Sequence, residues 1–417
     1  MREGGGALYG AGKVIPGASA LTDPTPVPAM QNASGTFRPA ADQGKRVMAF
    51  YGTLRHIPVL QTVLGRVPAS DTLAEGTMPD HVVYKVAGGD WPMIAHQPGA
   101  QATLLLLTDA SAEDVARLSD YELGWGYTLE RIAVRLNDGQ EIEAEMFMPA
   151  PEAMVADGLW SLPDWAQTHG EQAEAEAVEF ALLHGHMTPE EITARDGIIG
   201  VRATARIAAA KRPADPDRRV EDHVEEKWFR RAYANFFALD EISLKVRRYD
   251  GTMGDAMERA ALWVGDAVVV LPYDPLRDEV LLVEQFRTPV YVLGDPNPWV
   301  WEPVAGLIDA GEAPETAARR ETQEEAGLEL DRLEKVAGAY SSTGSSTEFL
   351  HLYIGIADLS NVDSRGGLEE EGEDIRSRVL SFDALMAEFD AGAFKDLPLV
   401  TTLLWLARHR DTLRDSA

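Results

Sequence analysis

Short runs of alternating or continuous apolar residues dominate the chain between residues 46 and 150. A helical segment at 111–118 interrupts them. Many short strands around one helix predict a small barrel-like β domain of the α+β class over 46–150. The expected strands are 47–51, 102–107, 131–136 and 142–147.

The second half of the chain also alternates, but its strands are separated by helical segments. Strands flanked by helices predict an α/β/α sandwich over 226–417. The expected strands are 236–249, 261–272, 279–285, 299–304, 350–356 and 378–381, followed by an apolar-striped helix at 401–414.

Two further segments differ from both domains in composition. Prolines punctuate residues 151–225, which contain two helical runs at 173–183 and 189–194, so this part is expected to be a helical connector. The first 45 residues are rich in Gly, Ala and Pro without periodicity, which predicts a disordered tail.

Charge and cysteine content narrow the function classes. The 417 residues carry 68 acidic and 38 basic side chains, a formal net charge of −30, which disfavours nucleic acid and membrane surfaces as partners. The chain has no cysteine, which excludes disulfides, thiolate metal sites and a cysteine nucleophile. The absence of a signal-peptide core and of any run long enough to span a membrane favours a cytoplasmic protein.

The chemistry concentrates in one glutamate-rich stretch. Glu321, Glu324 and Glu325 stand at i, i+3 and i+4, so a helix would place all three carboxylates on one face. Pro314 suits the first turn of that helix and Gly327 a left-handed C-cap. Like charges held so close repel unless a hard divalent cation, Mg²⁺ or Mn²⁺, lies among them.

The stretch 306–328 resembles the signature of the Nudix hydrolase family. The matching positions are Gly306, Glu312, Arg320, Glu321, Glu324, Glu325 and Gly327. Further matches at 271–275, 283–287, 302–306 and 367–375 resemble its ADP-ribose diphosphatase branch. The pairing of domains is similar to that of tellurite-resistance Nudix proteins.

This resemblance implies a metal-dependent hydrolysis of ADP-ribose to AMP and ribose 5-phosphate by a homodimer. The metal ligands it implies are Glu321, Glu325, the Ala305 carbonyl and Glu373. It implies that Arg287 contacts the diphosphate, with Glu302 behind it, and that Glu371 is the general base, with Glu324 and Glu370 as competitors. Thr343 stands where such enzymes usually carry a proline, which leaves another nucleoside diphosphate derivative open as the substrate.

The first domain resembles the gamma-glutamylcyclotransferase-like family through the turn Tyr51, Gly52, Thr53, Leu54 and Arg55 and through Glu122, which follows an aromatic residue. That likeness implies a turn that holds the carboxylate of a γ-glutamyl metabolite. It also implies that Glu122 moves protons while the substrate cyclises to 5-oxoproline.

Three functions therefore compete. The chain is a diphosphatase, or its main role is cyclotransfer or metabolite binding in the first domain, or it is a sensor that binds the nucleotide without turnover. Loss of ADP-ribose cleavage in Glu325→Gln, loss of 5-oxoproline release in Glu122→Gln, and binding without turnover distinguish them.

Overall fold

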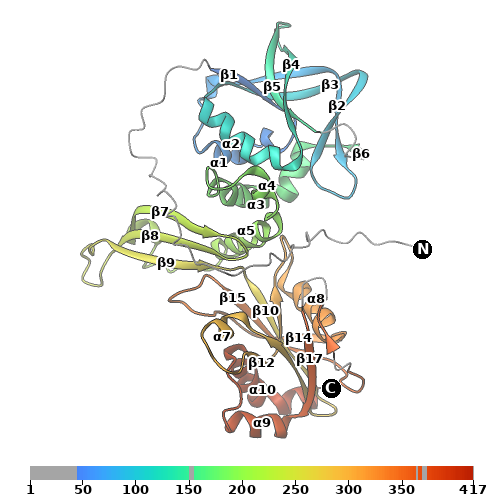
Figure 1. Cartoon of the computed structure of the whole chain (residues 1–417), viewed down its shortest axis with the longest axis vertical. Helices are drawn as coiled ribbons and strands as arrows, with labels where there is room; N and C mark the ends of the chain where they lie inside the picture. Colours follow the sequence, from blue (N-terminus) through green and yellow to red (C-terminus); the bar gives the residue numbers. More distant parts are fainter. Residues whose placement is uncertain (1–44, 150–154, 363–364, 369–372, 417) are drawn as a thin grey trace. The chain divides into compact units, whose positions relative to one another are not determined.

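Five strands near the start of the chain close into a barrel in the computed structural model (Figure 1). Their order is β3-β1-β5-β4-β2, and β2 pairs back onto β3 to complete the ring. The expected β-rich barrel is thus confirmed. The strands are β1 (Arg46–Phe50), β2 (Leu73–Val86), β3 (Pro92–Ala110), β4 (Thr128–Leu136) and β5 (Glu141–Met148), with β6 (Ala156–Leu159) at the edge of β2.

The structure describes residues 45–149, 155–362, 365–368 and 373–416, which form a first unit, 45–260, and a second unit, 261–416. The expected disordered tail, apart from Lys45, lies outside the described residues. None of the helices in these ranges combines the length and apolarity needed to cross a membrane.

Apolar side chains fill the barrel and also cover its outer face beneath two helices. Tyr51, Leu104 and Met146 point into the barrel cluster, whereas Phe50 and Leu107 belong to the cluster under the helices. This alternation follows from the two-residue period of a strand. The covering helices are α1 (Ile57–Leu64) and α2 (Ala112–Glu122), and short 3₁₀ turns occupy Thr53–Arg55, Ser70–Thr72 and Leu123–Trp125.

The β2–β3 hairpin is much longer than the predicted strand 102–107. Gly76, Pro79 and Gly99 are residues that ordinarily end strands, which is why the sequence pattern missed its length. The hairpin accommodates them with a break in register between Pro79 and His81.

The predicted helical connector contains four helices: the first is longer than the expected run 173–183, the second agrees with 189–194 to within one residue, and the last two were not predicted. They are α3 (Leu162–Ala181), α4 (Pro189–Thr193), α5 (Asp196–Ala210) and α6 (Val220–His223). Gly197 and Gly200 interrupt the first turns of α5, which is why the sequence pattern did not predict this helix. A separate three-stranded sheet follows, with β7 (Val224–Ala234), β8 (Ala238–Val246) and β9 (Met257–Trp263).

A buried ion network joins α3, α5, β7 and β8. Glu179, which has no exposed side-chain surface, accepts hydrogen bonds from Arg202 Nε at 2.9 Å, Arg206 Nη2 at 2.9 Å and Arg231 Nη1 at 2.6 Å. Arg231 also donates to Asp240 at 2.7 Å. Burial by itself would raise the pKa of Glu179, but Arg231 and Arg202 outweigh it and lower the pKa to about 2.

A mixed sheet forms the centre of the second unit. Its order is β14-β15-β10-β11-β17-β16, with β12 paired to β11, β13 paired to β10, and β10 parallel to β15. The strands are β10 (Ala267–Asp274), β11 (Glu279–Phe286), β12 (Trp299–Glu302), β13 (Val304–Leu307), β14 (Arg332–Tyr340), β15 (Phe349–Ile356), β16 (Arg365–Gly366) and β17 (Ile375–Ser381).

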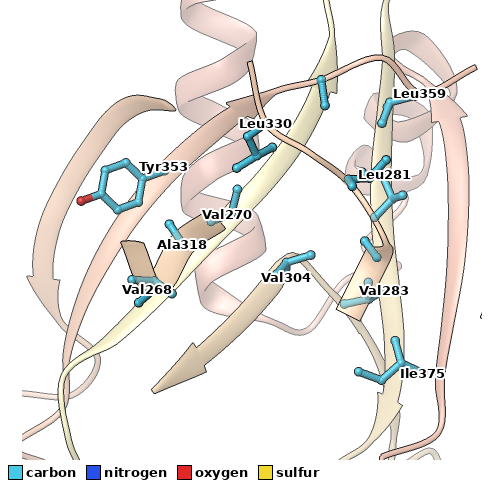
Figure 2. Packing of buried hydrophobic residues seen from close by; sticks show 14 of the residues in the cluster. Val268, Val270, Leu281, Val283, Val304, Ala318, Leu330, Tyr353, Leu359 and Ile375 are labelled. Carbon is cyan, nitrogen blue, oxygen red and sulfur yellow. The ribbon is translucent and has the colours of Figure 1, made fainter. Parts of the chain in front are cut away.

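Helices cover both faces of this sheet, so the predicted sandwich is confirmed from β10 onward, whereas the strand expected in it at 236–249 belongs to the separate sheet of the first unit. On one face Ala317 and Ala318 of α8 pack on Val268 and Val283, in the cluster that Figure 2 shows from close by. On the other face Leu385, Leu399 and Leu403 pack on the strands. The helices are α7 (Thr288–Val292), α8 (Pro314–Ala326), α9 (Phe382–Asp390) and α10 (Leu397–Asp415).

Several boundaries differ from expectation for local reasons. The run 261–272 was expected to be one strand, but β9 ends at Trp263 and β10 begins at Ala267, and the two strands belong to different sheets. The final helix starts at Leu397 rather than 401, since Asp396 accepts from Leu399 N as its N-cap. Strand β14 and helices α1 and α9 were not predicted.

The ion network predicts a large loss of stability in Glu179→Gln. Removing one partner leaves buried guanidinium groups uncompensated, so the free energy of unfolding in urea should fall by about 3–5 kcal/mol. The matched control on the same helix is Glu171→Gln, whose pair with Lys211 is more than half exposed, and it should cost at most about 1 kcal/mol. An equal loss in both variants would contradict the role of the network.

The same network predicts that part of the free energy of unfolding of the wild-type chain is lost at acidic pH. A carboxylate whose folded pKa is depressed stabilises the fold fully above its unfolded value, near 4.5, and ceases to do so as the pH falls toward 2. Urea titrations between pH 6 and about 3 should therefore show a loss that Glu179→Gln lacks. Parallel losses in both proteins would refute this assignment.

Candidate active site

Helix α8 carries the three glutamates singled out by their spacing. It begins at Pro314 and ends at Ala326, and Gly327 adopts the left-handed conformation with φ 64° as its C-cap. Both termini agree with the expectation from the sequence. The alanine face of the helix is buried against the sheet, so the glutamate face is directed toward β13 and the acidic loop after β15.

Glu325 is the most deeply buried of the three carboxylates, with 2% of its surface exposed. It accepts hydrogen bonds from the main-chain N of Ala305 at 3.1 Å and from Gln285 Nε2 at 3.3 Å. Burial raises its pKa well above the usual value, and the charges of Glu321 and Glu373 raise it further. An ionised Glu325 therefore needs additional positive charge nearby.

Glu321 lies directly against the main chain of Gly306. A Cβ at Gly306 would come within 2.1 Å of the Glu321 carboxyl carbon, so only glycine fits beside this side chain. Burial raises the pKa of Glu321 to about 7, with Glu324 and Glu373 adding to the rise and Arg320 opposing it. The structure thus brings Glu321 and Glu325 together next to the Ala305–Gly306 peptide.

Arg320 ties the helix to the loop before it. Its guanidinium donates to Glu312 at 3.2 and 2.9 Å, to Glu321 at 2.6 Å and to Glu324 at 3.1 Å. It also donates to the Leu307 carbonyl at 3.0 Å. One arginine therefore fixes the positions of several carboxylates.

Arg287 and Glu302 form a second fixed pair at the end of β11. The guanidinium donates through Nε at 2.8 Å and Nη2 at 2.9 Å to the two oxygens of Glu302. Burial raises the pKa of Glu302 to about 7, although the charge of Arg287 opposes the rise. Arg287 remains 37% exposed, so its Nη1 edge can meet a ligand while Glu302 holds the other edge.

The acidic loop approaches the end of α8 from the other side. Gly367 N donates to the Glu324 carbonyl at 3.1 Å, and Leu368 N donates to Glu373 at 3.2 Å. The charge of Glu373 acts on both Glu321 and Glu325. Glu370 and Glu371, named from the sequence as candidate bases, lie outside the described residues.

The donor set has the chemistry of a site for a hard divalent ion. Two carboxylates, the buried Glu325 and the half-buried Glu321, and the nearby Glu373 offer oxygen atoms, which such ions prefer. Within the four described ranges, no three acidic or histidine side chains already stand close enough together to hold an ion. The rise in pKa of both Glu321 and Glu325 nevertheless marks a place that lacks positive charge.

A second candidate site lies in the first unit, where Glu122 at the end of α2 is close to Tyr51 and Tyr127. Tyr51 is 5% exposed, and burial raises the pKa of its hydroxyl well above the usual value. The nearby charges of Tyr127 and Glu122 raise this pKa further. Burial alone raises the pKa of Glu122 to about 7. Among the described side chains, no hydrogen bond or ion pair to the Glu122 carboxylate is found.

The turn before α1 and the segment after α2 are both positioned by close main-chain packing. A Cβ at Gly52 would meet Pro92 at 2.8 Å, and one at Gly124 would meet the Pro189 carbonyl at 2.3 Å. Thr53 and Leu54 form a 3₁₀ turn whose N-cap is Gly52. Helix α4 therefore fixes the segment that directly follows Glu122.

Two side chains near the candidate sites were not anticipated from the sequence. Gln285 donates a hydrogen bond to Glu325. Asp396 caps α10; burial raises its pKa, and the positive charge of the nearby Arg287 opposes that rise. Gln285 is a buried polar residue near the end of β11, two positions after the buried apolar run 280–283.

Comparisons with known proteins agree with this arrangement. The model of the NUDIX domain matches residues 264–400, and that of "Gamma-glutamyl cyclotransferase, AIG2-like" matches residues 48–166. A solved "ADP compounds hydrolase" is 17% identical over 46% of this chain and 97% of its own, with a TM-score of 0.37, too low for an argument.

Curated relatives match the second half of the chain. An ADP-ribose pyrophosphatase of Escherichia coli (strain K12) is 37% identical over 44% of this chain and 87% of its own. That of Haemophilus influenzae is 33% identical over 44% and 86%, and a GDP-mannose pyrophosphatase of Cronobacter sakazakii is 33% identical over 40% and 87%. The chain belongs to the Nudix family, with an AIG2-like gamma-glutamyl cyclotransferase domain ahead of its Nudix domain.

Proposed function

We propose that the second unit hydrolyses the diphosphate of ADP-ribose to AMP and ribose 5-phosphate. The observation that carries this proposal is the pair of carboxylates, the buried Glu325 and the half-buried Glu321, held against the Ala305–Gly306 peptide. The choice of ADP-ribose as the substrate rests on relatives named ADP-ribose pyrophosphatase, which match over 87% of their length.

Glu321, Glu325, Glu373 and the Ala305 carbonyl would hold a divalent ion, Mg²⁺ in the first instance and Mn²⁺ as the alternative. When bound, the ion supplies positive charge against the diphosphate and Lewis acidity. Arg320 keeps the glutamates in place through its bonds to Glu321 and Glu324.

Arg287 orients the substrate with the edge of its guanidinium that Glu302 does not occupy. A guanidinium fixed on one edge loses little freedom when the other edge binds a phosphate. Glu371 is the proposed base. Glu324 is the alternative, because Arg320 Nη1 bonds only its Oε2 and leaves Oε1 able to accept a proton.

A nucleotide sugar diphosphate is a second substrate candidate for the same site. Relatives named GDP-mannose pyrophosphatase match with 33% identity, and Thr343 replaces a proline expected for ADP-ribose enzymes. A panel of ADP-ribose, GDP-mannose and dinucleotides, with and without Mg²⁺, decides between them. Cleavage of GDP-mannose with ADP-ribose left intact would refute the ADP-ribose assignment.

Glu325→Gln and Glu321→Gln should lower the turnover of ADP-ribose by about a hundredfold or more, because each removes a ligand charge from the ion. AMP release, followed by chromatography, measures the loss. The control is Glu329→Gln, an exposed glutamate just beyond the same helix, which should keep wild-type turnover. Full activity in both site variants would exclude the proposed metal site.

Gly306→Ala should also impair turnover, since the new Cβ would displace the Glu321 carboxylate. The double variant Gly306→Ala, Glu321→Asp shortens the acid and should recover part of the apparent Mg²⁺ affinity, measured from the metal dependence of AMP release. A single variant with unchanged metal dependence would show that Glu321 does not need this position.

Cyclotransfer in the first unit is a second function that a specific observation favours. Glu122 lies beside Tyr51 and Tyr127 in a domain matched by the cyclotransferase family. In the proposed step, Glu122 takes a proton from the α-amine as its nitrogen bonds to the γ-carbonyl carbon. It then returns a proton to the departing amine, and 5-oxoproline forms.

Release of 5-oxoproline from a γ-glutamyl amine should vanish in Glu122→Gln and persist in Glu325→Gln. Because a base acts in its ionised form, kcat/KM should rise as the pH increases through about 7, the raised pKa of Glu122. Glu143→Gln, at an exposed position of the same barrel, is the matched control. Release that survives in Glu122→Gln would assign the proton transfer elsewhere.

The homodimer, the cytoplasmic location, the link to tellurite resistance and the sensor hypothesis stay predictions. The first is tested by the mass of the chain in solution, and the last by ADP-ribose binding without AMP release.

A further inference from the structure

Two histidines lie opposite each other on the long β2–β3 hairpin. His81 of β2 and His96 of β3 are direct partners in the register of the two strands. Their ring centroids lie 5.4 Å apart, and the ring planes are nearly perpendicular at 86°. His96 is exposed and His81 is half-buried, so solvent ions can reach the pair.

A local irregularity creates this pairing and holds it in place. Pro79 pairs with Gln101 and His81 with His96, so residues 97–100 loop out opposite Asp80 alone. Asp80 adopts a left-handed conformation with φ 54°, and its carboxylate accepts a hydrogen bond from Gly99 N at 2.7 Å. Without the bulge the register would be continuous, and the two imidazoles would not be opposite each other.

The protonation of His81 is fixed by its main-chain neighbour. Its Nδ1 lies 2.8 Å from the Pro79 carbonyl, which can only accept, so Nδ1 carries the hydrogen. The other nitrogen, Nε2, then presents a lone pair. A histidine that donates one ring N–H to a carbonyl keeps the other nitrogen as its lone-pair donor, which is the arrangement typical of metal-binding histidines.

The separation of the rings fits one shared ion. Two imidazoles that bind a metal at about 2.0–2.1 Å from each ligating nitrogen, at near-tetrahedral angles, have ring centres roughly 5 Å apart. Imidazole nitrogens suit Cu²⁺, Ni²⁺ and Zn²⁺ rather than the hard ions that oxygen ligands prefer. The ligand chemistry therefore separates this place from the glutamate cluster of the second unit.

We propose that His81 and His96 bind one late first-row divalent ion, with water completing its coordination, and that this ion clips the two strands of the hairpin together. The affinity order expected for such a pair places Cu²⁺ first.

The test is a titration of the full chain with Cu²⁺ in saturating Mg²⁺, which occupies oxygen-ligand sites. The wild type should bind one equivalent whose electron paramagnetic resonance spectrum shows coupling to two imidazole nitrogens. His81→Asn and His96→Asn should each weaken this binding by at least about tenfold, since loss of even a supporting partner costs that much. Melting curves of the metal-free variants check their folding.

His169→Asn is the matched control, because this half-buried histidine in the same unit lies near Asp90 rather than near a second imidazole. It should bind Cu²⁺ as the wild type does. Equal Cu²⁺ affinity in the wild type, His81→Asn and His96→Asn would overturn the proposal and leave an ordinary edge-to-face ring contact. Equal weakening in His169→Asn would overturn it as well.

Discussion

Electrostatic repulsion between carboxylates that are shielded from water is the main constraint on the candidate active site of the second unit. Glu321 and Glu325 sit one turn apart on α8, both withdrawn from water, and Glu373 adds its charge from the acidic loop. Most of the surrounding structure serves to keep them there. Arg320 donates a hydrogen bond to Glu321, and the Ala305 amide donates one to Glu325. Gly306 has no side chain, which leaves room for the Glu321 carboxylate. Burying charges of one sign is costly, and the single guanidinium of Arg320 serves several carboxylates, which is why we propose a cation between Glu321 and Glu325.

The first unit solves a related problem by different means. Glu122 owes its raised pKa to burial alone, with two tyrosine hydroxyls rather than other carboxylates as neighbours. A lone carboxylate in such a setting exchanges protons near neutral pH and needs no ion. One chain therefore contains two acidic sites with distinct chemistry, and the number of charges in each distinguishes them.

The sequence predicted those features that depend on local rules. The spacing of Glu321, Glu324 and Glu325, Pro314 in the first turn and the Gly327 cap all depend on residues within a few positions of one another. The β-rich barrel and the sandwich followed from alternation. Contacts between distant residues were beyond it: the bond from Gln285 to Glu325 spans 40 positions, and the closure of β2 onto β3 required a register break that prolines and glycines concealed. The acidic residues 369–371 lie outside the described chain, so the choice of base rests on sequence alone.

The Glu179 network has a consequence for how such chains can be cut and recombined. The family match of the first domain ends at residue 166, yet the carboxylate at 179 takes its partners from α5 and from Arg231 on β7. A graft that moved β7 and β8 to another protein without α3 and α5 would keep the pair of Arg231 with Asp240 but would remove the Glu179 carboxylate from Arg231. A segment chosen for transfer to another protein should therefore extend past residue 166, where the family match ends, and include α3, α5, β7 and β8.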